Sequence, residues 1–211
     1  MKILFCDLNG TVLDDVPVWE KAMRAMFLIE NKEPPTISEY FAEYDGDYLA
    51  PYRTRGVTTP TEELNAIYRR VYAEHMESVQ MFAGVKKTLK ELRERGVLLA
   101  LLTGQEMNLA IPVLERLNMY HYFHWKLFQV RDKSKEMGNV ICLANAKRKA
   151  GDEIKISDCW SIGDSPFDIR EAKRAGVTSV SFLTGCIASE LLIRERPDFA
   201  IMSFKNLTRL R

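Results

Sequence analysis

The chain has 211 residues, 46% of them hydrophobic, which fits one domain with a sizeable insertion better than two full domains. Its 30 basic and 29 acidic residues leave a net charge of +1, too small for a field that would favour nucleic acid or an anionic membrane. The four cysteines lack metal-ligand spacing, and neither a signal peptide nor a bilayer-spanning apolar run is visible. We expect a cytoplasmic protein with no nucleic-acid or membrane partner, a monomer or homodimer.

Short apolar runs predict the strands of a buried sheet. In chain order they are 2–6, 97–102, a weaker run at 125–130, 158–162, 177–182 and 198–202. Helical patterns separate them, and Gly96 and Gly176 end the patterns over 84–95 and 166–175. Strands that alternate with helices of this length predict a parallel sheet covered on both faces. The fold class we expect is therefore α/β, with a Rossmann-like three-layer α/β/α core.

The stretch from 15 to 80 interrupts this alternation. It contains three helical patterns, at 16–31, about 36–50 and 61–78, and no apolar strand. An all-helical insertion after the first strand is the simplest interpretation. We expect a core domain formed by 1–14 and 81–211, and a helical cap domain formed by 15–80.

Polar residues follow four of the predicted strands. They lie at 7–11, at Thr103 and Gly104, at 132–135 and at 163–168. Ligands of open α/β sheets bind beyond the carboxyl ends of the strands, so these four groups are expected to converge on one crevice.

These residue types suit phosphoryl transfer. A carboxylate at a strand end, such as Asp7, can attack phosphorus and form an aspartyl-phosphate. Several carboxylates with a backbone carbonyl suit Mg²⁺, while a hydroxyl, backbone N–H groups and a lysine can hold a phosphate and offset its charge. The sequence thus indicates a magnesium-dependent site.

The motifs resemble those of the haloacid dehalogenase superfamily of phosphatases, in the branch with a helical cap inserted after the first strand. DLNGT at 7–11 is similar to motif one, DxDGT; LLTG at 101–104 resembles motif two; and GDSPFD at 163–168 resembles motif four, GDSxxD. The resemblance extends over the core from end to end.

The resemblance implies a role for each matching residue. Asp7 would be the nucleophile, and Thr103 and Gly104 would hold the phosphate. The implied magnesium ligands are Asp7, Asn9 through its backbone carbonyl, Asp164, and Asp168, the last either directly or through water.

The motif-three lysine is less plainly marked, because the family's usual Lys-Pro pair is missing. We favour Lys135, which stands at the right offset before a helix predicted over 138–150, as the catalytic and phosphate-binding lysine. Lys133 is the alternative, and a solvated surface position is the competing interpretation of Lys135.

Asn9 departs from the family pattern. The phosphatases of the family carry an aspartate there, which protonates the leaving oxygen and then activates water; an amide can do neither, a loss of about 10²–10⁴-fold. Five explanations stay open: a substrate with a good leaving group, another residue that takes over, a degenerate phosphate binder, a deliberate substitution, or deamidation of the Asn9–Gly10 pair.

The function we expect is that of a magnesium-dependent phosphatase or phosphotransferase acting on a small phosphorylated metabolite. The alternatives are an inactive phosphate-binding protein and, less favoured, a carbon–halogen hydrolase, which needs no magnesium and would leave GDSPFD without a purpose. Arg53 and Arg55 suit a substrate carboxylate or second phosphate, although a solvated helix edge is the simpler interpretation.

Overall fold

The computed structural model describes residues 1–44, 47–146, 148–184 and 187–210. Its main sheet has six parallel strands in the order β5-β4-β1-β6-β7-β8. Their bounds are Ile3–Cys6 (β1), Leu98–Leu102 (β4), Trp125–Leu127 (β5), Cys159–Gly163 (β6), Thr178–Phe182 (β7) and Phe199–Ile201 (β8). All six lie within the apolar runs expected to form strands, or extend one residue beyond, and the predicted α/β parallel-sheet class is confirmed.

Helices cover both faces of this sheet. They are α5 (Val85–Glu94), α6 (Met107–Arg116), α7 (Lys133–Asn145), α8 (Pro166–Ala175) and α9 (Ser189–Arg194), with a 3₁₀ helix at Phe204–Arg209. Alternate β1 side chains point to opposite faces: Leu4 belongs to the hydrophobic cluster that contains α5 and α6, whereas Phe5 belongs to the cluster that contains α7 and α8. The three layers follow from this alternation.

The segment from 15 to 79 is mainly helical, as the sequence indicates. It contains α1 (Val16–Leu28), α2 (Ile37–Glu43), α3 (Ala50–Thr54) and α4 (Thr61–His75), followed by a 3₁₀ turn at Met76–Ser78. The single pattern expected at about 36–50 is two short helices instead. A capping box between Thr36 and Glu39 starts α2, and Pro51 lies in the first turn of α3; residues 45 and 46 lie outside the described part.

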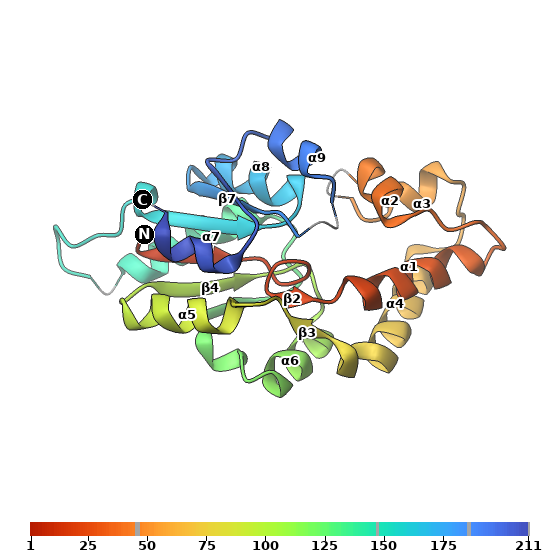
Figure 1. Cartoon of the computed structure of the whole chain (residues 1–211), viewed down its shortest axis with the longest axis horizontal. Helices are drawn as coiled ribbons and strands as arrows, with labels where there is room; N and C mark the ends of the chain where they lie inside the picture. Colours follow the sequence, from red (N-terminus) through yellow and green to blue (C-terminus); the bar gives the residue numbers. More distant parts are fainter. Residues whose placement is uncertain (45–46, 147, 185–186, 211) are drawn as a thin grey trace.

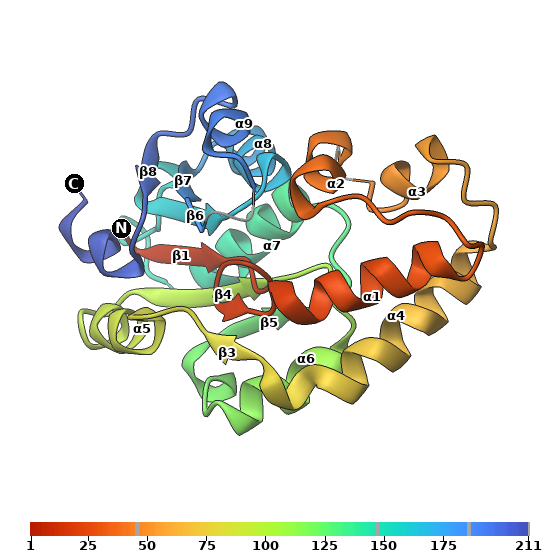
Figure 2. The ribbon, with the colours of Figure 1, turned by 45° about the vertical axis from the view of Figure 1, so that its right-hand side comes forward.

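These four helices have a hydrophobic cluster of their own, which includes Met23, Phe27, Tyr40, Tyr52 and Leu64. Figures 1 and 2 show them gathered at one end of the molecule, and in Figure 2 the β1 arrow points toward them. A short antiparallel ribbon, β2 (Leu13–Asp14) with β3 (Gln80–Met81), lies where the chain enters and leaves this segment. The helices therefore stand beyond the carboxyl ends of the strands.

Candidate active site

The site lies at the point where the sheet order reverses. From β1 the chain continues to β4 and β5 on one side, and then to β6, β7 and β8 on the other. The crevice between β1 and β6 is therefore the topological switch point, where open α/β sheets bind ligands. Asp7 follows β1 and Asp164 follows β6, so the two carboxylates flank this crevice.

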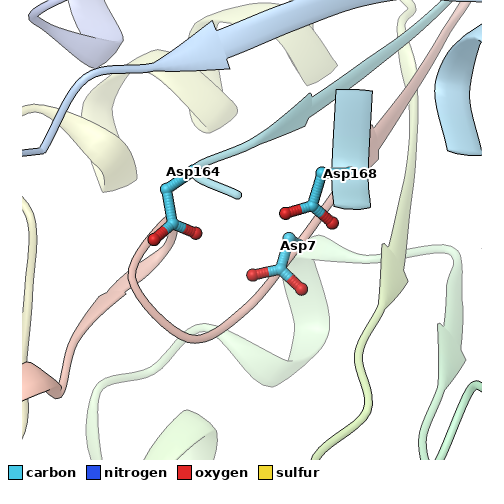
Figure 3. Close-up of side chains that lie close together, drawn as sticks. All are labelled: Asp7, Asp164 and Asp168. Carbon is cyan, nitrogen blue, oxygen red and sulfur yellow. The ribbon is translucent and has the colours of Figure 1, made fainter. Parts of the chain in front are cut away.

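Three carboxylates converge there. Asp7, Asp164 and Asp168 each offer one oxygen atom, and these atoms lie within 4.8 Å of one another (Figure 3). Asp168 is held by the capping box of α8, in which its Oδ2 accepts hydrogen bonds from the Ser165 hydroxyl at 2.6 Å and the Ser165 backbone N–H at 3.2 Å. Helix capping thus leaves Oδ1 of Asp168 free for another partner.

That partner is Lys133, not Lys135. The Lys133 ammonium donates to Asp7 Oδ1 at 2.5 Å and to Asp168 Oδ1 at 2.6 Å, and its side chain is 8% exposed. The side chain of Lys135 is exposed, and its backbone N–H donates to Asp132. The structure thus places Lys133, the alternative, in the cluster and leaves Lys135 outside it, because α7 starts at 133 rather than 138.

The earlier start of α7 has a local cause. Asp132 is the N-cap, and its Oδ1 accepts the Lys135 backbone N–H at 2.8 Å. Glycine normally weakens a helix interior, yet Gly138 lies within α7 and does not mark its start. One signal could have identified Lys133: with Met137, Val140 and Ile141 it forms a buried stripe at helical spacing, and a lysine on such a stripe needs buried partners.

Burial dominates the electrostatics of the cluster. It raises the pKa of Asp7 to about 7, against the opposing charge of Lys133, and Asp168 raises it further. Burial, followed by the charges of Asp7 and Asp168, also holds the pKa of Asp164 well above its usual range. Burial disfavours the Lys133 ammonium, but the two carboxylates outweigh it and raise its pKa. When ionised, the three carboxylates therefore carry more negative charge than the Lys133 ammonium offsets.

The cluster fits a hard divalent cation. Three carboxylates supply the oxygen ligands that Mg²⁺ prefers. Gly10, at φ 73°, leaves space for the Asp164 carboxylate, because a Cβ at position 10 would lie 2.2 Å from Asp164 Oδ2. The Thr11 hydroxyl donates to Asp164 Oδ1 at 2.8 Å and fixes the carboxylate in that space.

The motif-one loop contacts the end of β4. The Thr103 hydroxyl lies 3.2 Å from Asn9 Oδ1 and accepts the Gln105 backbone N–H at 3.0 Å. Thr103 and Asn9 are thus brought together as expected. Gly104 lies in the same turn, but a Cβ there would come no closer than 3.8 Å to Val130 O, so packing does not require glycine.

Sequence reasoning missed one buried acid in this loop region. Asp15 is 2% exposed and accepts hydrogen bonds from Asn9 Nδ2, from the Gly10 backbone N–H at 3.1 Å and from the Tyr72 hydroxyl at 3.0 Å. Its position before α1 is typical of an ordinary N-cap, although its side chain makes no capping bond. Contact with Tyr72, far along the chain, left no local signal.

The helical segment approaches the cluster through tyrosines. The pKa of Tyr44 is raised to about 12, first by burial and then by charges that include those of Asp168 and Asp7. Arg131 of the core lies 6.0 Å from the Tyr48 ring. The two arginines singled out in this segment have partners within it: Arg53 pairs with Asp47 at 3.1 Å, and Arg55 pairs with Glu43 at 2.6 Å.

A Rossmann-like core with an acidic cluster and a lysine at its switch point is typical of a hydrolase that uses a carboxylate nucleophile. The chain matches the haloacid dehalogenase-like hydrolase family over residues 3–182 and belongs to that family, which confirms the expected superfamily. None of the helices in the described ranges is long and apolar enough to cross a membrane.

Two curated relatives align with nearly the whole chain. One is a phosphoglycolate phosphatase from Pseudomonas syringae pv. tomato, 28% identical, and the other is phosphoglycolate phosphatase 1 from Pseudomonas aeruginosa, 26% identical; each alignment covers 98% of this chain and 78% of the relative. Among solved structures, a haloacid dehalogenase-like hydrolase from Streptococcus pneumoniae superposes with a TM-score of 0.83 at 18% identity, covering 99% of this chain and 97% of that one. A superfamily hydrolase from Geobacter sulfurreducens gives 0.68 at 16% identity over the full length of both chains.

Proposed function

We propose that this chain is a magnesium-dependent phosphatase, a phosphoric monoester hydrolase that acts through an aspartyl-phosphate at Asp7. The observation that carries the proposal is the buried contact of Lys133 with Asp7 and Asp168 at the switch point of the sheet. A lysine between a nucleophilic carboxylate and a metal-binding carboxylate suits the charge that phosphoryl transfer brings together. The curated relatives, named as phosphoglycolate phosphatases, support a small phosphorylated organic acid as the substrate class.

The residues would divide the work as follows. Lys133 holds Oδ1 of Asp7, and the other carboxylate oxygen attacks the phosphorus, forming an O–P bond as the bond to the alcohol oxygen breaks. Water then attacks the aspartyl-phosphate, which releases inorganic phosphate and the free carboxylate. The Thr103 hydroxyl, which donates to Asn9 Oδ1 at 3.2 Å in the free site, would turn its proton to a phosphoryl oxygen when substrate binds, and the Gly104 backbone N–H would donate to another.

The proposed magnesium ligands are Asp7, Asp164, Asp168 and the backbone carbonyl of Asn9. Bound Mg²⁺ would supply positive charge to the phosphoryl oxygens. Because the Asn9 amide has no acidic proton to transfer, the departing alcohol would take its proton from water, which favours substrates with good leaving groups.

We propose that residues 15–80 act as a cap that covers this site and that 1–14 and 81–211 form the core. The separate hydrophobic cluster of α1–α4 and the β2–β3 ribbon at the junction support this division. Tyr44 and Tyr48 stand on the core-facing side, as the charges acting on Tyr44 and the Arg131 contact indicate. A cap in this position would exclude water during transfer.

The test compares Asp7→Asn with Asp14→Asn, a matched control because Asp14 is exposed in β2. Hydrolysis of phosphoglycolate, other small phosphomonoesters and acetyl phosphate is measured with Mg²⁺ and with EDTA. We expect wild type and the control to release phosphate only with Mg²⁺, and Asp7→Asn to lose at least about 10³-fold. Full activity of Asp7→Asn would overturn the proposal.

A phosphate-binding protein without turnover is the second candidate, and Asn9 is the observation that favours it. It predicts calorimetric binding of inorganic phosphate in the presence of Mg²⁺ and no phosphate release from any ester in the panel. Peptide mapping at residue 9 belongs to both tests, because the activity of a fraction deamidated to aspartate would otherwise be attributed to Asn9.

Dehalogenation that survives EDTA would favour the third alternative, a carbon–halogen hydrolase.

A further inference from the structure

Asn9, which is partly buried, contacts the buried Asp15 beside the nucleophile loop. The Asp15 carboxylate receives three neutral donors, namely the Asn9 amide, the Gly10 backbone N–H and the Tyr72 hydroxyl. Among the ion pairs of the described residues, none involves Asp15. The carboxylate therefore depends on these hydrogen bonds for its stability in a buried position.

The Asn9 side chain is fixed at both ends by this arrangement. Its Nδ2 donates to Asp15, and its Oδ1 lies 3.2 Å from the Thr103 hydroxyl, which can donate to it. An aspartate at position 9 would bring two carboxylate oxygens together with no donor between them. Such a contact loses a buried hydrogen bond and adds repulsion between like charges. The residue type at position 9 is thus tied to the residue type at position 15.

We propose that Asn9 and Asp15 are a matched donor–acceptor pair in which Asp15 is the positioning residue for the Asn9 side chain. It follows that an aspartate at position 9 is accommodated when position 15 carries a hydrogen-bond donor such as an amide. The inference rests on the proposed function in one respect, which is that the Asn9 side chain lies next to the reacting groups. Through Tyr72 of α4, the same carboxylate also joins the helical segment to the nucleophile loop.

An exchange of the two residues tests the pair. In the double variant Asn9→Asp/Asp15→Asn the size of both side chains is kept and the hydrogen bond is reversed, with the side chain at position 15 as donor. The amide oxygen introduced at position 15 can still accept the Gly10 N–H, and the amide nitrogen can donate to the Tyr72 oxygen. The matched control is Asn9→Asp/Asp14→Asn, which removes the same charge from an exposed neighbour.

The first measurement is the thermal unfolding of the full chain without substrate or metal. We expect Asn9→Asp to lower Tm by about 5 °C or more, and the exchange to recover at least about half of the summed losses of the two single variants. The Asp14 control should recover nothing. If the losses of the two single variants simply add in the double variant, Asn9 and Asp15 are not a matched pair.

The second measurement is kinetic and separates positioning from simple stability. With Mg²⁺, the exchanged variant should exceed Asn9→Asp in kcat by at least about tenfold on an alkyl phosphate, with KM within about twofold, and the gain should be smaller on acetyl phosphate, which needs no protonated leaving group. Equal kcat values for the two variants would refute the positioning role. Recovery of Tm with no hydrolysis by any variant would leave the pair standing and refute the proposed function.

Discussion

Replacing Lys133 with methionine is the sharpest test of the candidate active site. The ammonium lies 2.5 Å from Asp7 and 2.6 Å from Asp168, and its side chain is 8% exposed. Methionine keeps much of the buried stem but leaves the carboxylates without their cation. Breaking a buried ion pair in this way costs about 3–5 kcal/mol. For a chain of this length, each kcal/mol lowers Tm by about 2–4 °C, so the expected loss is about 6–20 °C.

The same substitution should also impair turnover. Removal of one electrostatic group at a reacting centre typically costs about 10²–10³-fold in kcat. Differential scanning fluorimetry gives the loss of stability, and initial rates of phosphate release give the loss of turnover. Saturating Mg²⁺ should recover part of the lost Tm, because a bound cation offsets the same carboxylates.

Lys135→Met is the matched control for this variant. Lys135 is two residues away on the same helix, but its side chain is exposed. We expect its Tm to stay within about 2 °C of wild type and its rate within about twofold. Equal losses in the two variants, or a larger loss at Lys135, would refute the assignment of Lys133 to the site.

Three further predictions concern the acidic cluster. Mg²⁺ at 100 times its Kd should stabilise wild type by about 2.7 kcal/mol, a rise in Tm of about 5–11 °C that EDTA or Asp164→Asn removes in a fluorimetric melt. Because the pKa of Asp7 rises from 3.8 to about 7 on folding, the metal-free folded state retains a proton and its stability should fall as pH rises through that window; urea melts of Asp7→Asn should show a flatter profile. Gly10→Ala places a Cβ 2.2 Å from Asp164 Oδ2 and should lower Tm and turnover more than Gly96→Ala, which has a similar φ of 80° but open space around it.

The sequence predicted the sheet well because of how its strands are buried. Strands covered on both faces are apolar throughout, so Ile3–Cys6 and Leu98–Leu102 stand out as continuous runs. The site residues at the ends of these strands followed from the rule that parallel strands present their carboxyl ends at one edge. The β2–β3 ribbon was not predictable, because each of its strands has two residues and its partner is distant in the sequence.

Side-chain contacts between distant segments were the part that the sequence did not reveal. The choice between Lys133 and Lys135 depended on where one helix starts, and a single Asp132 cap decides that. Asp15 left no signal in the sequence because its contact with Tyr72 joins positions 57 residues apart. Periodicity describes which face of an element is buried, and it contains no information on which polar groups meet there.

The charge of the cluster bears on every function considered for this chain. Three carboxylates and one ammonium give a formal charge of −2, and the raised pKa values of Asp7 and Asp164 express the same imbalance as retained protons. Two like charges 4 Å apart repel by about 4 kcal/mol at an effective dielectric constant near 20. When Asp7 is ionised, as nucleophilic attack requires, a phosphate dianion or a carboxylate substrate would meet this repulsion unless a cation offset it. A metal-independent dehalogenase, which also needs Asp7 ionised, would face this obstacle, whereas a magnesium-dependent phosphatase would use the excess negative charge to bind its cation.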